Sequence, residues 1–487
     1  MWHKTVVQRD WRDDRIEQLE RENCELRARV TTLEALVAKL IEQVNRNSRN
    51  SSKPPSSDGP AKPKRPKNKS SGRKPGGQPG HDKHERQLVP VDQVDSLTVV
   101  KPEHCECCSA VLTEYDLCPT RHQYCELPVT RPLVHEVHQH SGYCARCGIW
   151  TLAKLPDGVP TRAFGPSVDS TVGVLMGVYR LSKRSVAAVM AELFGLQMSV
   201  GAVVGCQKAV SDALAQPVLE AHEFAQQQSV KNADETSWRQ GNKRAWLWTV
   251  VTTGVTMFMI QSSRSAEAAR AILGGISGIL CTDRYSGYGW WPTRQRQVCW
   301  SHLIRDFTAI SERAGQSKQI GNALLAEAER MFAWWNRVKD GTLKPSTFQV
   351  YMRSLQCRVE QLLGQGSLAD HSKTAGTCKK ILEVFPSLWT FVHVQGVEPT
   401  NNAAERAVRH AVVYRKISYG THSEWGSRFV ERILTVHATC KQQGTSALAF
   451  VRHACEAALT RSPPPSLIPA DQPSQLRSSN QPAALAA

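Results

Sequence analysis

The sequence predicts a multidomain chain: an N-terminal coiled coil, a small zinc-ribbon-like module, a helix-turn-helix, and an α/β core with an all-helical insertion. Three observations carry this prediction: an unbroken heptad pattern near the N-terminus, two Cys-x-x-Cys pairs further along, and closely spaced strand-like segments from residue 230 onward. With 487 residues and a 41% hydrophobic content, the chain is long enough to form several folded domains.

Residues 13–47 form the predicted coiled coil. The a positions are Ile16, Asn23, Val30, Val37 and Val44, and the d positions are Leu19, Leu26, Leu33 and Leu40. β-Branched residues at a with Leu at d favour two parallel strands, and the single polar a residue fixes the register. We therefore expect a homodimer or higher oligomer through this helix. The alternative is a lone amphipathic helix that packs on its own domain.

Residues 48–92 are rich in Ser, Pro, Gly and Lys, and no core is expected there. Between Lys53 and Lys74 there are eight basic residues and one acidic residue, Asp58. This segment is either a linker or a basic arm that lies along phosphates. The arm residues expected to bind DNA are Lys62, Lys64, Arg65 and Lys67.

Residues 93–160 contain two Cys-x-x-Cys pairs, Cys105 with Cys108 and Cys144 with Cys147. Four thiolates can hold one tetrahedral zinc ion, which would stabilise a module that lacks a large core. We expect a structural zinc ion on these cysteines. Alternative ligands are His104, Cys107, Cys118 and Cys125, and the bland alternative is a set of ordinary reduced cysteines.

Residues 161–225 contain two short helical patterns around a turn at Gly195. Ser182 or Ser185 can cap the first helix and Ser199 the second. This spacing is typical of a DNA-binding helix-turn-helix, although other helical hairpins share it.

Residues 226–455 form the predicted α/β core, with a helical insertion at 305–396 and a proline-rich, disordered tail at 462–487. The apolar run from Trp246 to Ile260 is too short to span a membrane and indicates a buried strand.

Three carboxylates stand out by context. Asp234 is expected at the end of a short strand, Asp283 ends the later strand-like segment GILCTD, and Glu405 lies in a helix with Thr400 or Asn401 as its cap. Phosphodiester chemistry uses two divalent ions roughly 3.5 to 4 Å apart, and Mg²⁺ or Mn²⁺ prefers carboxylate ligands. Each residue also has a structural explanation: a turn cap, a turn residue, or an ion pair of Glu405 with Arg409.

The composition favours a polyanionic partner. Lys and Arg number 61 against 44 Asp and Glu, for a formal charge of +17, although solvated surface charge could also explain this. The N-terminus has no secretory signal, and the odd number of cysteines, 15, indicates reduced thiols. We expect a cytoplasmic protein without membrane contact.

Taken together, the motifs resemble the large-subunit transposases of insertion sequence sixty-six. The matching pieces are the zipper, NSSKPPSSD, KPGGQPGH, the paired cysteine motifs, ADET, TDRYSGY, the Trp-Ser-His unit at 300–302 and TNNAAERAVR, in that order. They extend from the zipper to about residue 455. One departure is the first cysteine motif, HCECCSA, which lacks the usual Pro and Gly and leaves the zinc ligands open.

The resemblance implies a ribonuclease-H-like catalytic fold and a metal-dependent reaction that cleaves element ends and joins them to target DNA. It assigns the catalytic, metal-binding roles to Asp234, Asp283 and Glu405, and it implies small accessory proteins of the same element as partners. On the helix of Glu405, Arg406 and Arg409 are expected to bind DNA, and so are His302 and Arg305. The alternatives are a sequence-specific repressor and an inactive transposase copy.

Overall fold

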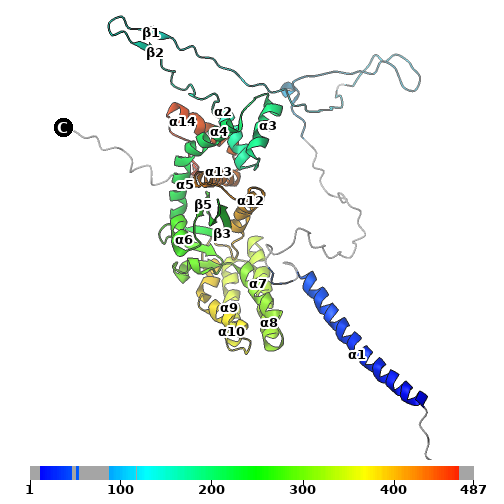
Figure 1. Ribbon diagram of the computed structural model, residues 1–487. Helices are drawn as coiled ribbons and strands as arrows, with labels where there is room; N and C mark the ends of the chain where they lie inside the picture. The colour runs from blue at the N-terminus through cyan, green and yellow to red at the C-terminus, as the bar shows by residue number, and fades with distance from the viewer. Residues whose placement is uncertain (1–10, 47–50, 54–86, 117, 471–487) are drawn as a thin grey trace, which may run out of the picture.

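The computed structural model describes residues 11–46, 51–53, 87–116 and 118–470 (Figure 1). The arm residues Lys62, Lys64, Arg65 and Lys67 lie outside the described residues. The tail expected to be disordered lies outside them only from residue 471. Residues 462–470 pack on the core instead: Leu467 is buried, and its carbonyl accepts a hydrogen bond from Gln443.

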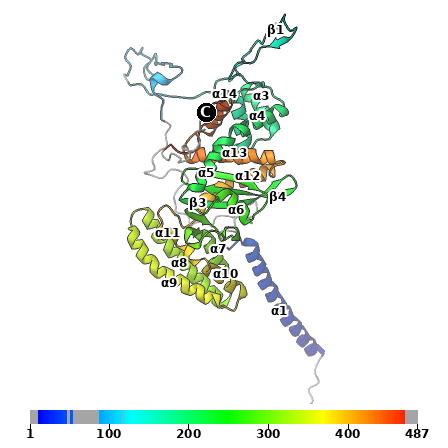
Figure 2. The ribbon, with the colours of Figure 1, turned by 90° about the vertical axis from the view of Figure 1, so that its left-hand side faces the viewer.

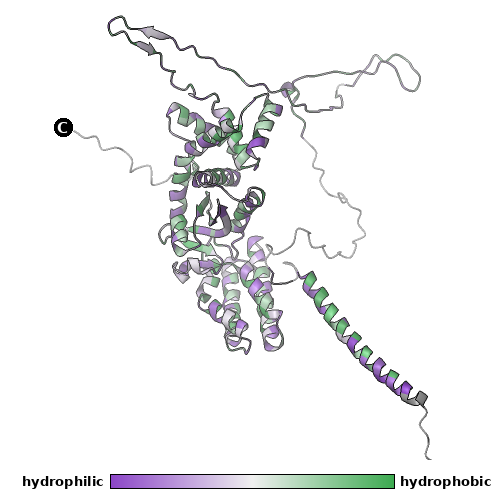
Figure 3. Cartoon of the chain, in the orientation of Figure 1, coloured by the Kyte–Doolittle hydropathy of each residue, from purple (hydrophilic) through white to green (hydrophobic). Residues whose placement is uncertain are grey.

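The first helix, α1 (Trp11–Asn45), covers nearly the whole predicted coiled-coil segment. Its described a and d residues are exposed, from 45% at Leu19 to 83% at Val44. Figure 3 shows hydrophobic residues along much of its length. No other described part of the chain covers this apolar surface. An exposed apolar stripe of this kind is what one helix of a coiled coil requires.

The core is a five-stranded mixed sheet with strand order β5-β4-β3-β6-β7. Strands β3 (Val230–Gln240), β4 (Lys243–Val251) and β5 (Thr256–Gln261) form an antiparallel meander, and the apolar run from 246 to 260 forms parts of β4 and β5. The loop at 252–255 is closed by a hydrogen bond between Thr252 and Val255. β6 (Ile279–Thr282) and β7 (Arg296–Val298) then add in parallel beside β3.

The free edge of β5 is covered by α13 (Glu424–Gln442), which lies along one margin of the sheet (Figure 2). The outward backbone N–H groups of Thr256, Phe258 and Ile260 donate to acceptors four residues apart on this helix. These acceptors are Thr439 Oγ1, Thr435 Oγ1 and Glu431 Oε1. Four helical residues rise about 6 Å and two strand residues about 6.6 Å, so the two ladders match. The helix thereby satisfies an edge that could otherwise pair with another chain.

Four helices precede the sheet: α2 (Pro166–Gly177), α3 (Lys183–Phe194), α4 (Val200–Ala213) and α5 (Ala215–Gln227). Ser182 caps α3 and Ser199 caps α4, and Gly195 ends α3 in a left-handed conformation (φ 63°). α14 (Ala447–Thr460) packs on α2 and α4. The expected boundary between residues 225 and 226 therefore lies within one hydrophobic cluster, which runs from Val172 to Leu467.

The segment after β7 is helical: α7 (Trp300–Ser311), α8 (Gly315–Lys339), α9 (Pro345–Ser367), α10 (Ser372–Leu382) and the short α11 (Thr390–His393). These helices share a second hydrophobic cluster and form the lower lobe in Figure 1. α8 crosses α7 closely at Gly321, where an added Cβ would lie 2.3 Å from the backbone nitrogen of Ser311. Glycine at this position permits the helices to pack.

Candidate functional site

Asp234 and Asp283 are brought together by the pairing of β3 with β6. The paired residues are Val230 with Ile279, Lys231 with Leu280 and Asn232 with Cys281, and each pair differs by 49 in residue number. Asp234 and Asp283 keep this difference two positions beyond the last pair. Asp234 lies in the middle of β3, not at the end of a short strand as expected. Asp283 follows the last residue of β6.

The electrostatic environment of Asp234 disfavours its charge. Burial, followed by the neighbouring charge of Glu235 and those of Asp283 and Glu405, raises the pKa of Asp234 to about 8. The one hydrogen bond that opposes this shift comes from the backbone N–H of Glu235, at 2.9 Å from Oδ1. A largely buried carboxylate that faces two further carboxylates would be stabilised in its charged form by a cation.

Glu405 lies in the first turn of α12 (Asn402–Ser418). Asn401 occupies the N-cap position, but neither its side chain nor that of Thr400 caps the helix, contrary to the sequence expectation. The Asn401 side-chain amide donates instead to the carbonyl oxygen of Ala233 at 2.7 Å. This bond ties the start of α12 to the strand residue that precedes Asp234, and so places Glu405 beside the two aspartates.

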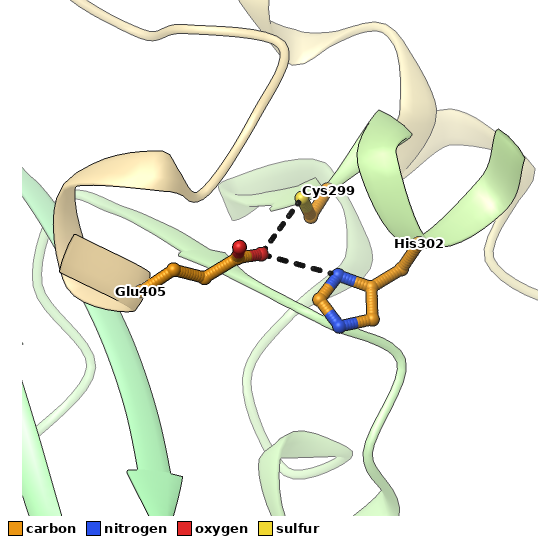
Figure 4. Close-up of side chains that lie close together, drawn as sticks. All are labelled: Cys299, His302 and Glu405. Carbon is orange, nitrogen blue, oxygen red and sulfur yellow. Dashed lines mark hydrogen bonds and ion pairs between the residues drawn. The ribbon is translucent and has the colours of Figure 1, made fainter. Parts of the chain in front are cut away.

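Glu405 faces two side chains from the start of α7, as Figure 4 shows. Cys299 Sγ lies 3.9 Å and His302 Nδ1 lies 3.5 Å from Glu405 Oε1. The ion pair of Glu405 with Arg409, which was the structural alternative to a metal-binding role, is not found among the described residues. Burial and the charge of Arg305 lower the pKa of His302. His302 thus lies against the carboxylate, whereas the sequence suggested a DNA contact.

Among the described residues, one group of three Cys, His, Asp or Glu side chains has its ligand atoms within 4.8 Å of one another: Cys299, His302 and Glu405. Asp234, Asp283 and Glu405 do not approach one another that closely. A site with two ions roughly 3.5 to 4 Å apart does not require it, because its outer ligands bind different ions. The carboxylate donor set and the raised pKa of Asp234 fit hard divalent ions such as Mg²⁺.

The basic residues near the carboxylates differ in exposure. Arg406 and Arg409 are exposed on α12 and form no ion pair with a described residue, so both are free to meet an anion. Arg305 is half-buried on α7.

Glu235, next to Asp234, points to the opposite face of β3, as alternation along a strand requires. Its side chain is 1% exposed, and Arg264 Nε donates to it at 2.8 Å. The hydroxyl of Tyr288 also donates to Glu235. Although both are acidic, Glu235 has an arginine and a tyrosine hydroxyl as partners, whereas Asp234 accepts a hydrogen bond from a backbone N–H. The sequence ADET could not distinguish them without the strand register.

The two cysteine motifs form similar exposed turns. Cys105 accepts a backbone hydrogen bond from Ser109, and Cys144 accepts one from Gly148. Backbone N–H groups lower the pKa of both thiols, chiefly that of Cys108 for Cys105 and that of Cys147 for Cys144. The second turn joins β1 (Ser141–Tyr143) to β2 (Trp150–Leu152). The four sulfurs are not gathered into one group in the part of the chain that is described.

Sequence reasoning missed Cys299 and the positioning role of Asn401. A Cys-x-x-His spacing at 299–302 was available as a signal, and so was the asparagine pair before Glu405. Only the fold shows that these segments meet.

The sheet, its helical cover and the carboxylates beside β3 and β6 define an α/β protein whose acidic site suits divalent metal ions. Residues 165–429 match the model of the transposase IS66 family, which covers more than half of the chain. The chain belongs to this family, as its motifs indicated.

Two further matches concern the N-terminal part of the chain and one relative. Residues 8–87 match a family of unknown function, DUF6444. The chain is similar to "Uncharacterized protein y4qI" of Sinorhizobium fredii (strain NBRC 101917 / NGR234), with 26% identity over 234 residues. That match covers 43% of this chain and 42% of the relative, so the chain spans less than half the length of this relative.

Proposed function

We propose that this protein cleaves DNA at the ends of a mobile element and joins the freed 3′ ends to target DNA, with Asp234, Asp283 and Glu405 as its metal-binding carboxylates. The observation that supports this best is the approach of these residues from β3, β6 and α12, where burial and the neighbouring carboxylates raise the pKa of Asp234 to about 8. A ribonuclease-H-like fold agrees with an antiparallel meander extended in parallel from its first strand.

Two divalent ions in this site would activate the attacking oxygen and stabilise the departing one. Asp234 and Asp283 would hold them from adjacent strands, and Glu405 would complete the set from α12. Asn401 keeps Glu405 in register with β3. Arg406 and Arg409 would hold flanking phosphates by charge-assisted hydrogen bonds. The same arrangement serves cleavage and joining, since water and a 3′-hydroxyl are both oxygen nucleophiles.

The other modules support this activity in our proposal. The α1 helix dimerises the protein, α3 and α4 contribute DNA binding, and the cysteine turns hold a structural zinc ion. No described helix is long and apolar enough to cross a membrane. Small accessory proteins of the same element remain proposed partners.

The test is metal-dependent cleavage of element-end DNA by the purified chain. Asp234→Asn, Asp283→Asn and Glu405→Gln keep the side-chain shape but remove the charge that holds the ions. Each should reduce cleavage by more than the roughly 10- to 100-fold typical of outer-shell changes, while DNA binding persists. Asp234→Asn should also leave the metal-free protein at least as stable, because it removes a carboxylate that burial penalises.

Asp370→Asn and Glu360→Gln are the matched controls, because both residues are exposed and lie in the helical segment away from the sheet. If one of these three variants cleaves at the wild-type rate, the residue that it replaces is not a metal ligand. Specific DNA binding without cleavage in Mg²⁺ or Mn²⁺ would favour the repressor or the inactive copy.

A further inference from the structure

The three side chains in Figure 4 have the geometry of a soft-metal site. The separations of 3.5 Å (Nδ1 to Oε1) and 3.9 Å (Sγ to Oε1) are close to the roughly 3.3 to 3.7 Å between ligands of a tetrahedral zinc ion. All three ligand atoms lie within 4.8 Å of one another, so small rotations of the side chains would complete the site.

The start of α7 (Trp300–Ser311) prepares two of these ligands. Cys299 is its N-cap residue, and His302 follows three positions later, so both side chains reach the same side of the first turn. The backbone N–H of Asn401 lies 3.2 Å from Cys299 Sγ, and a helix N-terminus favours a thiolate. A sulfur with such donors is a better metal ligand than an ordinary buried thiol.

His302 supplies an independent observation. Its Nδ1 is shielded from solvent and has no hydrogen-bond partner in the part of the chain that is described, although it points at Glu405. An unpaired buried ring nitrogen costs free energy unless a donor or a metal satisfies it. A metal ion between the three side chains would satisfy this nitrogen and also neutralise Glu405.

The donor set distinguishes this site from the carboxylate site. Thiolate and imidazole select zinc-class ions, whereas Mg²⁺ prefers oxygen ligands. The two sites nevertheless share Glu405. Because Glu405 Oε1 is the atom next to Cys299 and His302, an ion bound there competes for this carboxylate with the ions held by Asp234 and Asp283.

We propose that Cys299, His302 and Glu405 bind one zinc-class divalent ion, with water as the fourth ligand, and that this ion inhibits cleavage by withdrawing Glu405 from the magnesium-binding set. Binding releases the Cys299 thiol proton to solvent. The inhibition rests on the proposed function, whereas the metal site itself does not.

The first test uses Co²⁺ as the probe on the full chain, because cobalt occupies zinc sites and cobalt–thiolate coordination absorbs light. Wild-type protein should bind one equivalent more than Cys299→Ala and than His302→Ala. Cys440→Ala is the matched control, since Cys440 is a buried cysteine on α13, and it should bind as wild type does. All four proteins retain the cysteine turns. The difference in cobalt stoichiometry between two of them therefore excludes any cobalt that these turns bind.

Equal stoichiometry in wild type, Cys299→Ala and His302→Ala would overturn the site. Thermal unfolding identifies any variant that has not folded. If Cys299→Ala or His302→Ala does not fold, the cobalt stoichiometry of the other variant tests the site. Glu405→Gln should weaken cobalt binding at least about tenfold and keep the thiolate absorption.

The second test titrates Zn²⁺ into Mg²⁺-dependent cleavage, with each protein normalised to its own zinc-free rate. Wild type should lose activity and recover it when a chelator is added, and Cys299→Ala should require at least about ten times more zinc for the same fractional loss. Equal sensitivity of the two would overturn the inhibition. If no protein cleaves in Mg²⁺, the proposed function and the inhibition both fail, and the metal site is judged by cobalt binding alone. If wild type binds no more cobalt than Cys299→Ala and His302→Ala, the metal site and the inhibition fail, whereas the proposed function stands.

Discussion

At the scale of single residues, the site depends on side chains that oppose or satisfy charge. Asp234 and Glu235 are neighbours in sequence, yet Glu235 has Arg264 and Tyr288 as partners while Asp234 faces two more carboxylates. Asn401, at the start of the helix that carries Glu405, donates a hydrogen bond to the carbonyl oxygen of Ala233, the residue before Asp234. Ala233 is almost fully buried. We regard Asn401 as a positioning residue, since it acts through Glu405.

Replacing Asn401 with alanine should displace Glu405 and leave the Ala233 carbonyl unpaired. We expect a loss of about 1 to 3 kcal/mol in the free energy of unfolding. We also expect cleavage to fall roughly 10- to 100-fold, with a higher Mg²⁺ concentration needed for half-maximal rate. Asn402→Ala is the control, because Asn402 is the exposed neighbour. A stability loss without any change in the Mg²⁺ dependence would show that Asn401 is merely structural.

At the scale of elements, α13 stabilises the sheet by taking the place of a sixth strand at the β5 edge. Its three acceptors, Glu431, Thr435 and Thr439, follow the helical repeat, and the donors follow the strand repeat. Glu431 is the only ionisable member of this ladder. Burial raises its pKa to about 7, although Arg428 at 2.9 Å opposes the shift.

A carboxyl group with a raised pKa makes stability depend on pH in a definite direction. Below pH 4.5 Glu431 is protonated in both the folded and the unfolded states; between pH 4.5 and about 7 only the folded state keeps the proton, so stability falls as the pH rises. The full change is about 3 kcal/mol. Glu431→Gln should flatten this part of the curve of thermal unfolding against pH. Glu329→Gln, at an exposed position of α8, should keep the wild-type slope; parallel curves for all three proteins would contradict the prediction.

The α1 helix yields a prediction of its own. A peptide of residues 13–47 should dimerise at micromolar concentration, because its a and d residues are exposed in the single chain. Leu26→Lys with Leu33→Lys should make it monomeric, whereas lysine substitution of Gln18 and Thr31, away from the a and d positions, should not. Sedimentation equilibrium measures this, and a monomeric wild-type peptide would exclude the zipper.

At the scale of the whole molecule, the chain folds back on itself. α13 and α14 follow the carboxylate site in sequence but pack with α2, α4 and β5 into one hydrophobic cluster. A truncation after α12 would therefore expose the core of the N-terminal helices as well. The formal charge of +17 is that of the full sequence, and it suits the polyanionic partner that the proposed function requires.

Charge on α12 should be measurable in the salt dependence of DNA binding. Arg406→Ala with Arg409→Ala should reduce the slope of log affinity against log salt by about 0.9 for each phosphate that is no longer neutralised, hence by about 1.8 for two phosphates. Lys379→Ala with Lys380→Ala on α10 is the control, and it should leave the slope unchanged. An unaltered slope in the arginine variant would show that these side chains are only solvated.

The sequence alone determined the local elements and the family. Heptad spacing predicted α1, serine caps and Gly195 predicted the ends of α3 and α4, and the ordered motifs identified the transposase family, because each depends on short-range pattern. Tertiary structure decided which distant groups meet: Asp234 with Asp283 through the β3–β6 register, Asn401 with Ala233, Cys299 and His302 with Glu405, and α13 with the β5 edge. These contacts join segments some 50 to 180 residues apart, and their energy depends on burial and on charge partners that no local pattern specifies.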